Sequence, residues 1–139
     1  MSDTTDLQTW LEAFLRDHGG VAGTVHVRPP DGDLELAASV NIPQVVQDVV
    51  RRIPLGKGMA GLAWERNEPI STCNIKDDSS GKVRPGAKAV DAGAGVALPV
   101  HDSVSRVRAV VGIAYRDERT LTESELAGLS SAAEHLPER

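Results

Sequence analysis

Three glycines near the middle of the chain are the residues whose spacing most clearly suggests chemistry. They form a G-x-G-x-x-G pattern at Gly56, Gly58 and Gly61. Such a pattern can hold the phosphates of a dinucleotide when it lies between a buried parallel strand and a long helix. Here residues 51–55 resemble a helix end and a turn, and the helical run after the glycines ends near Arg66, because Asn67-Glu68-Pro69 follows. We therefore predict that the glycines serve tight turns and close packing of a short helix.

Thiol and metal chemistry have little support in the sequence. The one cysteine, Cys73, cannot form an intramolecular disulfide or a two-thiol redox cycle within one chain. The four histidines are His18, His26, His101 and His135. They are far apart, without an i,i+4 pair or a Cys-x-x-Cys motif, so we predict no metal site. We interpret His26 and His101 as ordinary residues on the polar faces of strands.

Length and charge limit the class of protein. The 139 residues suffice for one domain with a core, and no repeat or linker divides them, so residues 1–139 are assigned to a single domain. The net charge of −5 disfavours binding to nucleic acid or to an anionic membrane. No apolar run approaches the roughly 18 residues of a membrane span, and the acidic N-terminus does not resemble a signal peptide. These features predict a cytoplasmic protein.

Hydrophobic periodicity predicts four helical segments. The first follows a capping box at residues 5–8 with Thr5 as the cap, and its apolar stripe consists of Leu7, Trp10, Leu11, Phe14 and Leu15. The second spans residues 42–53, the third is the short helix after the glycines, and the last begins at a capping box, Thr122 to Glu125. The stripe of the first helix either covers the chain's own sheet or partly meets the same helix of a second copy.

Alternating and β-branched residues predict the strands. They are expected at residues 21–28, 34–38, 70–74, 94–101 and 106–116. The first two form a hairpin around the turn at residues 29–32. Residues 75–93 are charged, rich in glycine and non-periodic, and a loop of this length in a compact domain is either functional or mobile.

The order of these elements resembles a GAF domain. The motifs that carry the likeness are GKGMAG at 56–61, EPI at 68–70, VALPV at 96–100, VVGI at 110–113 and LT at 121–122. The resemblance covers nearly the whole chain. It implies an α+β fold with a central antiparallel sheet of five or six strands. The terminal helices would lie on one face of that sheet, and the short helix and the 75–93 loop would roof the other.

The resemblance also raises an enzymatic alternative, because free methionine-(R)-sulfoxide reductases share this fold. Their chemistry is thiol attack on a sulfoxide followed by disulfide resolution. Ala60 stands where such enzymes carry a cysteine, residues 88–91 contain none, and Cys73 matches none of the family's cysteines. We therefore predict that the protein is not an enzyme, with a reductase as a minor alternative.

The function implied by the resemblance is that of a non-catalytic sensory or regulatory domain. It would bind a small molecule under residues 58–66 and 75–93, act in signal transduction, and use no cofactor. The candidate ligand-binding residues are Trp64 as a wall, Cys73, and Asp78, Lys88 and Asp91 as polar anchors. The simpler interpretation of these residues is a core indole and solvated loop charges. The alternative function is a ligand-free interaction module, which forms a homodimer through the first and last helices or binds a signalling protein.

Overall fold

The computed structural model describes residues 4–72 and 92–138 of the chain, and these form an α+β fold. The helices are α1 (Thr4–His18), α2 (Gln44–Val50), α3 (Gly58–Arg66) and α4 (Glu123–Ala133). The strands are β1 (Ala22–Val27), β2 (Leu34–Val40), β3 (Arg52–Ile53), β4 (Ile70–Thr72), β5 (Ala94–His101) and β6 (Val107–Tyr115). The predicted fold class, with an antiparallel sheet of five or six strands, is confirmed.

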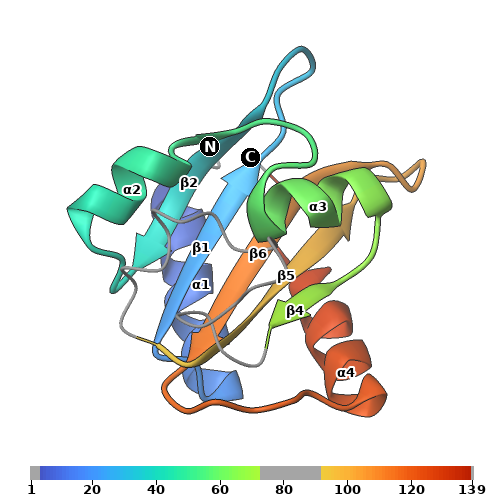
Figure 1. Cartoon of the computed structure of the whole chain (residues 1–139). Helices are drawn as coiled ribbons and strands as arrows, with labels where there is room; N and C mark the ends of the chain where they lie inside the picture. The colour runs from blue at the N-terminus through green and yellow to red at the C-terminus, as the bar shows by residue number, and fades with distance from the viewer. Residues whose placement is uncertain (1–3, 73–91, 139) are drawn as a thin grey trace.

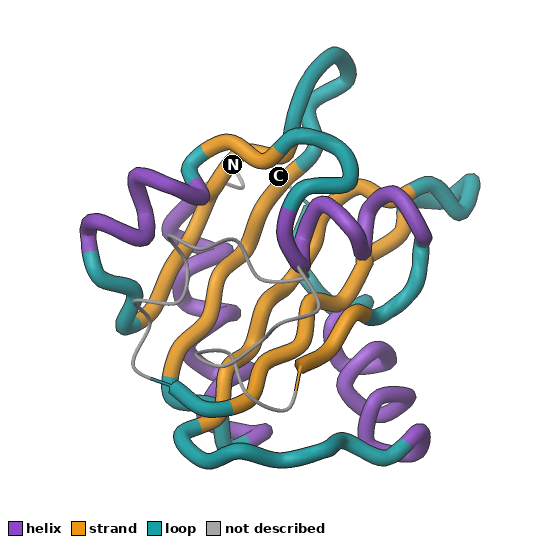
Figure 2. The backbone as a smooth tube through the Cα atoms, in the orientation of Figure 1, coloured by secondary structure: helices purple, strands orange, loops and turns teal. Residues whose placement is uncertain are grey.

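The strands form one six-stranded sheet in the order β3-β2-β1-β6-β5-β4, and every pair is antiparallel. Helices α1 and α4 lie behind the sheet in Figure 1, and α2 and α3 lie in front of it. Figure 2 shows the strands side by side between the two pairs of helices. None of the described helices is long and apolar enough to cross a membrane.

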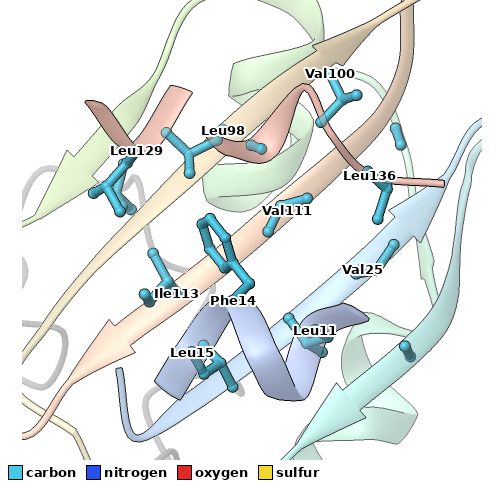
Figure 3. Packing of buried hydrophobic residues seen from close by; sticks show 14 of the residues in the cluster. Leu11, Phe14, Leu15, Val25, Leu98, Val100, Val111, Ile113, Leu129 and Leu136 are labelled. Atoms are coloured by element: carbon cyan, nitrogen blue, oxygen red, sulfur yellow. The ribbon is translucent and has the colours of Figure 1, made fainter. Parts of the chain in front are cut away.

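The sheet face under α1 and α4, called here the packed face, carries the larger hydrophobic cluster. The apolar stripe of α1 points into it, with Leu7 and Leu11 fully buried. Figure 3 shows Leu11, Phe14 and Leu15 of this helix against side chains of the central strands. The stripe therefore covers the chain's own sheet, which was one of the two interpretations of the sequence.

Helix α2 is shorter than the sequence predicts, because its last predicted turn is a strand. The helix ends at Val50, and Ile53 pairs with Leu34 in the two-residue strand β3. Two local effects explain the change. The residue before Pro54 disfavours helical backbone, and the edge of β2 offers hydrogen bonds, such as that from the Leu36 amide to the Arg51 carbonyl at 2.9 Å.

The three glycines have the structural role that the sequence predicts. Gly56 and Gly58 adopt positive φ angles of 79° and 67°, which non-glycine residues rarely do. A Cβ atom at Gly61 would lie 2.6 Å from the Pro54 carbonyl oxygen, so only glycine allows this close approach of α3 to the preceding turn. The strand before them is a short antiparallel edge strand, unlike the buried parallel strand of a dinucleotide fold.

A capping box explains where α4 begins, whereas the start of α1 differs from the sequence prediction. The Glu125 amide donates to the Thr122 hydroxyl at 3.0 Å, and the Glu125 carboxylate accepts from the Thr122 amide at 2.9 Å. The predicted capping box of the last helix is therefore confirmed. Helix α1 begins at Thr4, so Thr5 lies inside the helix instead of preceding it as a cap.

Candidate functional site

The other face of the sheet, under α2 and α3, is called here the hollow face. Along part of β5 and β6, large side chains such as Leu98, Val111 and Ile113 lie in the packed-face cluster and alternate with small residues that line the hollow face. On β5 and β6 the small residues are Gly95, Ala97, Gly112 and Ala114. Because these side chains are short, they do not fill the space between the sheet and the two helices above it.

A cavity of about 140 Å³ lies in this space. Its floor is formed by β1, β5 and β6, and its upper wall by residues of α2 and α3. The side chains of the wall are mainly apolar and include Ile42, Val46, Val50, Ile53, Met59 and Ala60. Among the described lining residues, Thr24 and His26 are those with polar side chains. The described lining is thus mainly apolar, with two polar side chains on the floor, a composition that ligand sites commonly have.

His26 lies at the point where the cavity floor meets helix α2. Its side chain is only 2% exposed, and its Nε2 donates a hydrogen bond to the Val50 carbonyl at 2.8 Å. Val50 is the last residue of α2, where carbonyl groups have no partner within the helix. The imidazole therefore satisfies a helix end, and a carbonyl partner requires that the ring proton be on Nε2.

The second ring nitrogen of His26, Nδ1, is buried and has no hydrogen-bond partner within the described part of the chain. Burial lowers the pKa of His26 to about 4, and the hydrogen bond to Val50 opposes only part of this effect. The ring is therefore neutral at pH 7, and its Nδ1 is a hydrogen-bond acceptor. A buried acceptor without a partner costs free energy, and a native protein usually retains one for a reason.

The sequence interpretation of His26 as an ordinary polar-face residue is wrong. Strand periodicity correctly puts His26 on the same face as Thr24, but that face is covered by α2 and not open to water. The pairing of β1 with β2 also shifts at Val25/His26, as at a β-bulge, a feature that often occurs near functional sites. Local sequence carries no signal for either event, because both depend on α2 and β2.

The predicted ligand-binding residues fall into two groups. Trp64 of α3 is partly buried and packs against the hydrophobic cluster of the hollow face, but it is not among the residues that line the cavity. Cys73, Asp78, Lys88 and Asp91 lie outside the described residues, as does most of the predicted 75–93 roof. Of the predicted roof on residues 58–66, Gly58, Met59 and Ala60 line the cavity.

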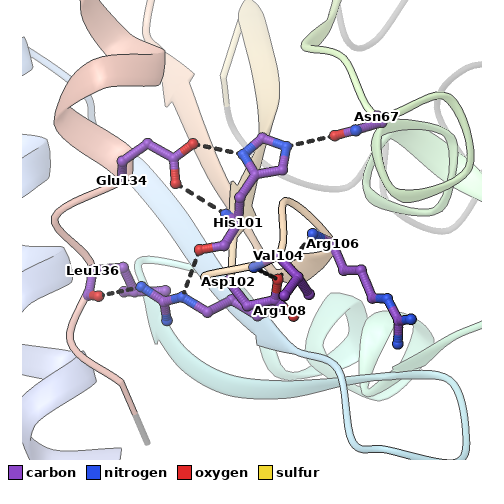
Figure 4. A network of polar contacts seen from close by, with 8 residues as sticks. All are labelled: Asn67, His101, Asp102, Val104, Arg106, Arg108, Glu134 and Leu136. Atoms are coloured by element: carbon purple, nitrogen blue, oxygen red, sulfur yellow. Dashed lines mark hydrogen bonds and ion pairs between the residues drawn. The ribbon is translucent and has the colours of Figure 1, made fainter.

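A second polar cluster joins three elements away from the cavity (Figure 4). The Nδ1 atom of His101 lies 2.6 Å from the Glu134 carboxylate, and its Nε2 lies 2.5 Å from Oδ1 of Asn67. Partial burial raises the pKa of Glu134, but hydrogen bonds from the His101 backbone and ring outweigh this and lower it overall. Asn67 ends α3 and Glu134 follows α4, so this cluster ties the two helices to the end of β5.

Metal binding has no support in residues 4–72 and 92–138, where no group of three or more His, Cys, Asp or Glu side chains could hold an ion. The described elements form a small α+β domain with two helices on each face of an antiparallel sheet and a cavity on one of those faces. The family model described as the GAF domain matches residues 6–136. The chain therefore belongs to the GAF domain family, whose members are typically sensory or regulatory modules.

Solved structures similar to this chain include both signalling domains and enzymes. The GAF domain of a phosphoenolpyruvate-protein phosphotransferase from Coxiella burnetii has a TM-score of 0.67 and 18% identity, covering 97% of this chain and 92% of that one. The type II free methionine-R-sulfoxide reductase from Thermoplasma acidophilum has a TM-score of 0.72 and 19% identity, covering 93% and 85%.

The free methionine-R-sulfoxide reductase from Neisseria meningitidis, solved in complex with its substrate, has a TM-score of 0.75 and 16% identity. That likeness covers 96% of this chain and 74% of the reductase chain. No curated protein matches this chain. Because the identities to the solved structures are low, the likeness shows a shared fold and does not assign an activity.

Proposed function

We propose that the protein is a sensory or regulatory GAF domain that binds one small molecule in the cavity of the hollow face. The observation that carries this proposal is the 140 Å³ cavity between the sheet and helices α2 and α3, with its apolar wall. An unfilled space of this size loses the packing contacts that close-packed interiors normally have. A ligand that fills such a space and binds only the folded chain would stabilise the protein.

The proposal extends to the absence of catalysis. The position that the sequence matches to a reductase cysteine is Ala60, and this residue lines the cavity with a methyl group instead of a thiol. A methyl group cannot attack a sulfoxide. The proposal also places the protein in the cytoplasm, and the net charge of −5 supports a protein that does not bind nucleic acid or an anionic membrane.

The first experiment is native mass spectrometry on gently purified protein. A bound small mass is expected in the wild type and in Ala127→Phe, whose added ring is on the exposed surface of α4. It should be lost in Ala60→Phe, where the ring enters the cavity. Loss in both variants, or in neither, would show that the bound molecule does not occupy this cavity.

Two rival functions predict other results in the same preparation. A dimer with nothing bound would favour a ligand-free interaction module that pairs through α1 and α4 or binds a signalling protein. The exposed large hydrophobic residues of the described chain are Val45, Leu55 and Val104, and none of them lies on α1 or α4. This disfavours a dimer interface made of apolar side chains of these two helices. Reduction of free methionine sulfoxide that disappears in Cys73→Ser would favour the reductase.

A further inference from the structure

The edge of β2 that faces away from β1 is only partly covered by a strand. Strand β3 pairs with residues 34–35 of β2, and the Leu36 amide donates to the Arg51 carbonyl at 2.9 Å. Among the described elements, residues 37–40 have no strand beside them on this edge. A strand edge with unpaired peptide groups can pair with another chain, so proteins usually cover or protect it.

The side chain of Gln8, on helix α1, covers the next part of this edge. Its Nε2 donates a hydrogen bond to the Ser39 carbonyl at 2.7 Å, and its Oε1 accepts one from the Ser39 amide at 3.2 Å. In an antiparallel ladder, a strand residue exchanges the same two bonds with the residue opposite it. The carboxamide of Gln8 therefore takes the place of the peptide groups of a neighbouring strand.

Neighbouring residues of α1 hold Gln8 at this edge. Leu7, just before it, and Leu11, three residues after it, are fully buried in the cluster of the packed face. Helix α1 lies behind the sheet in Figure 1, and the Gln8 side chain reaches the Ser39 backbone from there. Because the burial of the two leucines fixes the helix, the contact with Ser39 requires only that the Gln8 side chain be ordered.

Other features that protect strand edges are absent from residues 37–40. This stretch, Ala37-Ala38-Ser39-Val40, contains neither a charged residue nor a proline, and proteins commonly use both at strand edges. A register shift interrupts the pairing of β1 with β2 at Val25/His26, but residues 38–40 are in regular pairing with β1. Without Gln8, this part of β2 would be a regular and uncharged strand edge.

We propose that Gln8 keeps the β2 edges of two copies of this chain from pairing with each other. Ser39 presents a donor and an acceptor on the same side of the strand, so two such edges fit each other in antiparallel orientation about a twofold axis at Ser39. A second copy supplies this matching edge, whereas another partner would have to contribute an extended segment of its own. The inference is independent of the cavity, and it concerns a strand edge and not the α1–α4 interface of the rival dimer.

The test is the solvent exchange of the Ser39 amide, measured by NMR on ¹⁵N-labelled protein at low and at high protein concentration. In wild type the amide should be protected equally at both concentrations, because Gln8 accepts its hydrogen bond. In Gln8→Ala at low concentration, exchange should become about three- to tenfold faster, the effect of losing one neutral hydrogen bond. At high concentration the protection should return, because the amide then donates to Ser39 of the second copy.

Two further variants and one measurement on the unaltered protein make the result specific. Thr9→Ala removes another polar side chain of α1 from an exposed position and should behave as wild type. Gln8→Met keeps the length of the side chain without its polar atoms and should behave as Gln8→Ala, so the test does not depend on the folding of one variant. In wild type, a nuclear Overhauser effect between the Gln8 side-chain amide and the Ser39 amide should confirm the contact itself.

Three results would overturn the inference. Exchange of the Ser39 amide at the same rate in wild type and in the Gln8 variants would show that Gln8 does not cover the edge. Fast exchange at both concentrations in these variants would show that the uncovered edge does not pair with a second copy. An equal dependence on concentration in wild type would show that the edge pairs in spite of Gln8. None of these results bears on ligand binding in the cavity, so the proposed function stands or fails separately.

Discussion

The two faces of the sheet are made from the same strands and differ in how completely they are filled. On the packed face, Val111 and Ile113 alternate with residues that point the other way, and they lie in a cluster of buried side chains under α1 and α4. On the hollow face, Gly112 and Ala114 of the same strand leave the space that holds His26. One strand therefore supplies stability on one side and a site on the other.

This difference shows how a small domain can retain a cavity on one face of its sheet. The packed face carries the larger cluster of buried apolar side chains, and burial of apolar surface is the main favourable term in folding. The hollow face can then retain an empty space and an unsatisfied buried nitrogen, each of which costs free energy. The following experiments test whether the two faces differ in this way, from the largest expected effect to the smallest.

The largest effect is expected from truncating matched isoleucines on the two faces. Ile113→Ala on the packed face should lower the free energy of unfolding by about 3–4 kcal/mol, because it opens a new cavity in a filled region. Ile53→Ala should cost about half as much, because a side chain in the wall of a cavity makes fewer packing contacts than one inside a filled cluster, although both isoleucines are almost fully buried. Urea unfolding measures both. Equal losses would show that the hollow face is filled in solution.

The stability of the protein should depend on pH through His26, which lies on the hollow face. His26 has a folded-state pKa of about 4 against an ordinary value of 6.5, so between these pH values the unfolded chain binds a proton that the folded chain does not. The free energy of unfolding should therefore fall as the pH is lowered from about 6.5 to 4, by on the order of 3 kcal/mol in total.

The control for this pH dependence is His26→Gln, which has no titrating group at this position. Its unfolding free energy, measured in urea at several pH values, should lack the His26 contribution in that range. If wild type and His26→Gln lose stability in parallel, the buried neutral state of His26 is contradicted.

Replacing an alanine by the larger valine should also destabilise the packed face more than the hollow face. Ala109→Val on the packed face should destabilise the protein by about 1–3 kcal/mol, since the added methyl groups have no space. Ala97→Val on the hollow face should be tolerated within about 0.5 kcal/mol, because its methyl groups enter the cavity. Thermal unfolding of the two variants checks this. A larger loss for Ala97→Val would mean that the cavity cannot accept additional atoms.

The smallest effect is expected at the polar cluster that links the two pairs of helices. Glu134→Gln removes the charge that faces the His101 ring at 2.6 Å and should cost below about 1 kcal/mol, because both side chains are partly exposed. The loss should shrink at high salt, and unfolding measured at two salt concentrations tests this. A loss above about 3 kcal/mol would show that the tie between α3 and α4 is a major determinant of stability.

Much of the fold follows from local sequence. The alternation in residues 94–101 and 106–116, the helical stripe of α1 and the capping box at Thr122 each specify an element through nearby residues alone. The order of these elements was enough to identify the fold. The exception is residues 51–53. Their apolar spacing predicts a helix that continues through Ile53, but Arg52 and Ile53 form strand β3 and pair with β2.

The site was much less predictable than the fold. The sequence singled out Trp64 and four residues that lie outside the described part of the chain, and the cavity lining does not include Trp64. A signal for the cavity was present in the alternation of small residues at Gly95, Ala97 and Gly112. That signal is ambiguous in sequence, because small residues also allow helices to pack closely on a sheet.

By itself, the sequence determined the elements, their order and the large-to-small alternation of the central strands, because each depends on residues that are close along the chain. Only the tertiary structure decided that α2 lies over β1, which buries His26 and directs its Nε2 to the Val50 carbonyl. These two residues are 24 positions apart. Burial and hydrogen-bond partners depend on such distant contacts, so a histidine that the sequence presents as an ordinary polar-face residue becomes, among the described residues, a buried side chain with one unpartnered ring nitrogen.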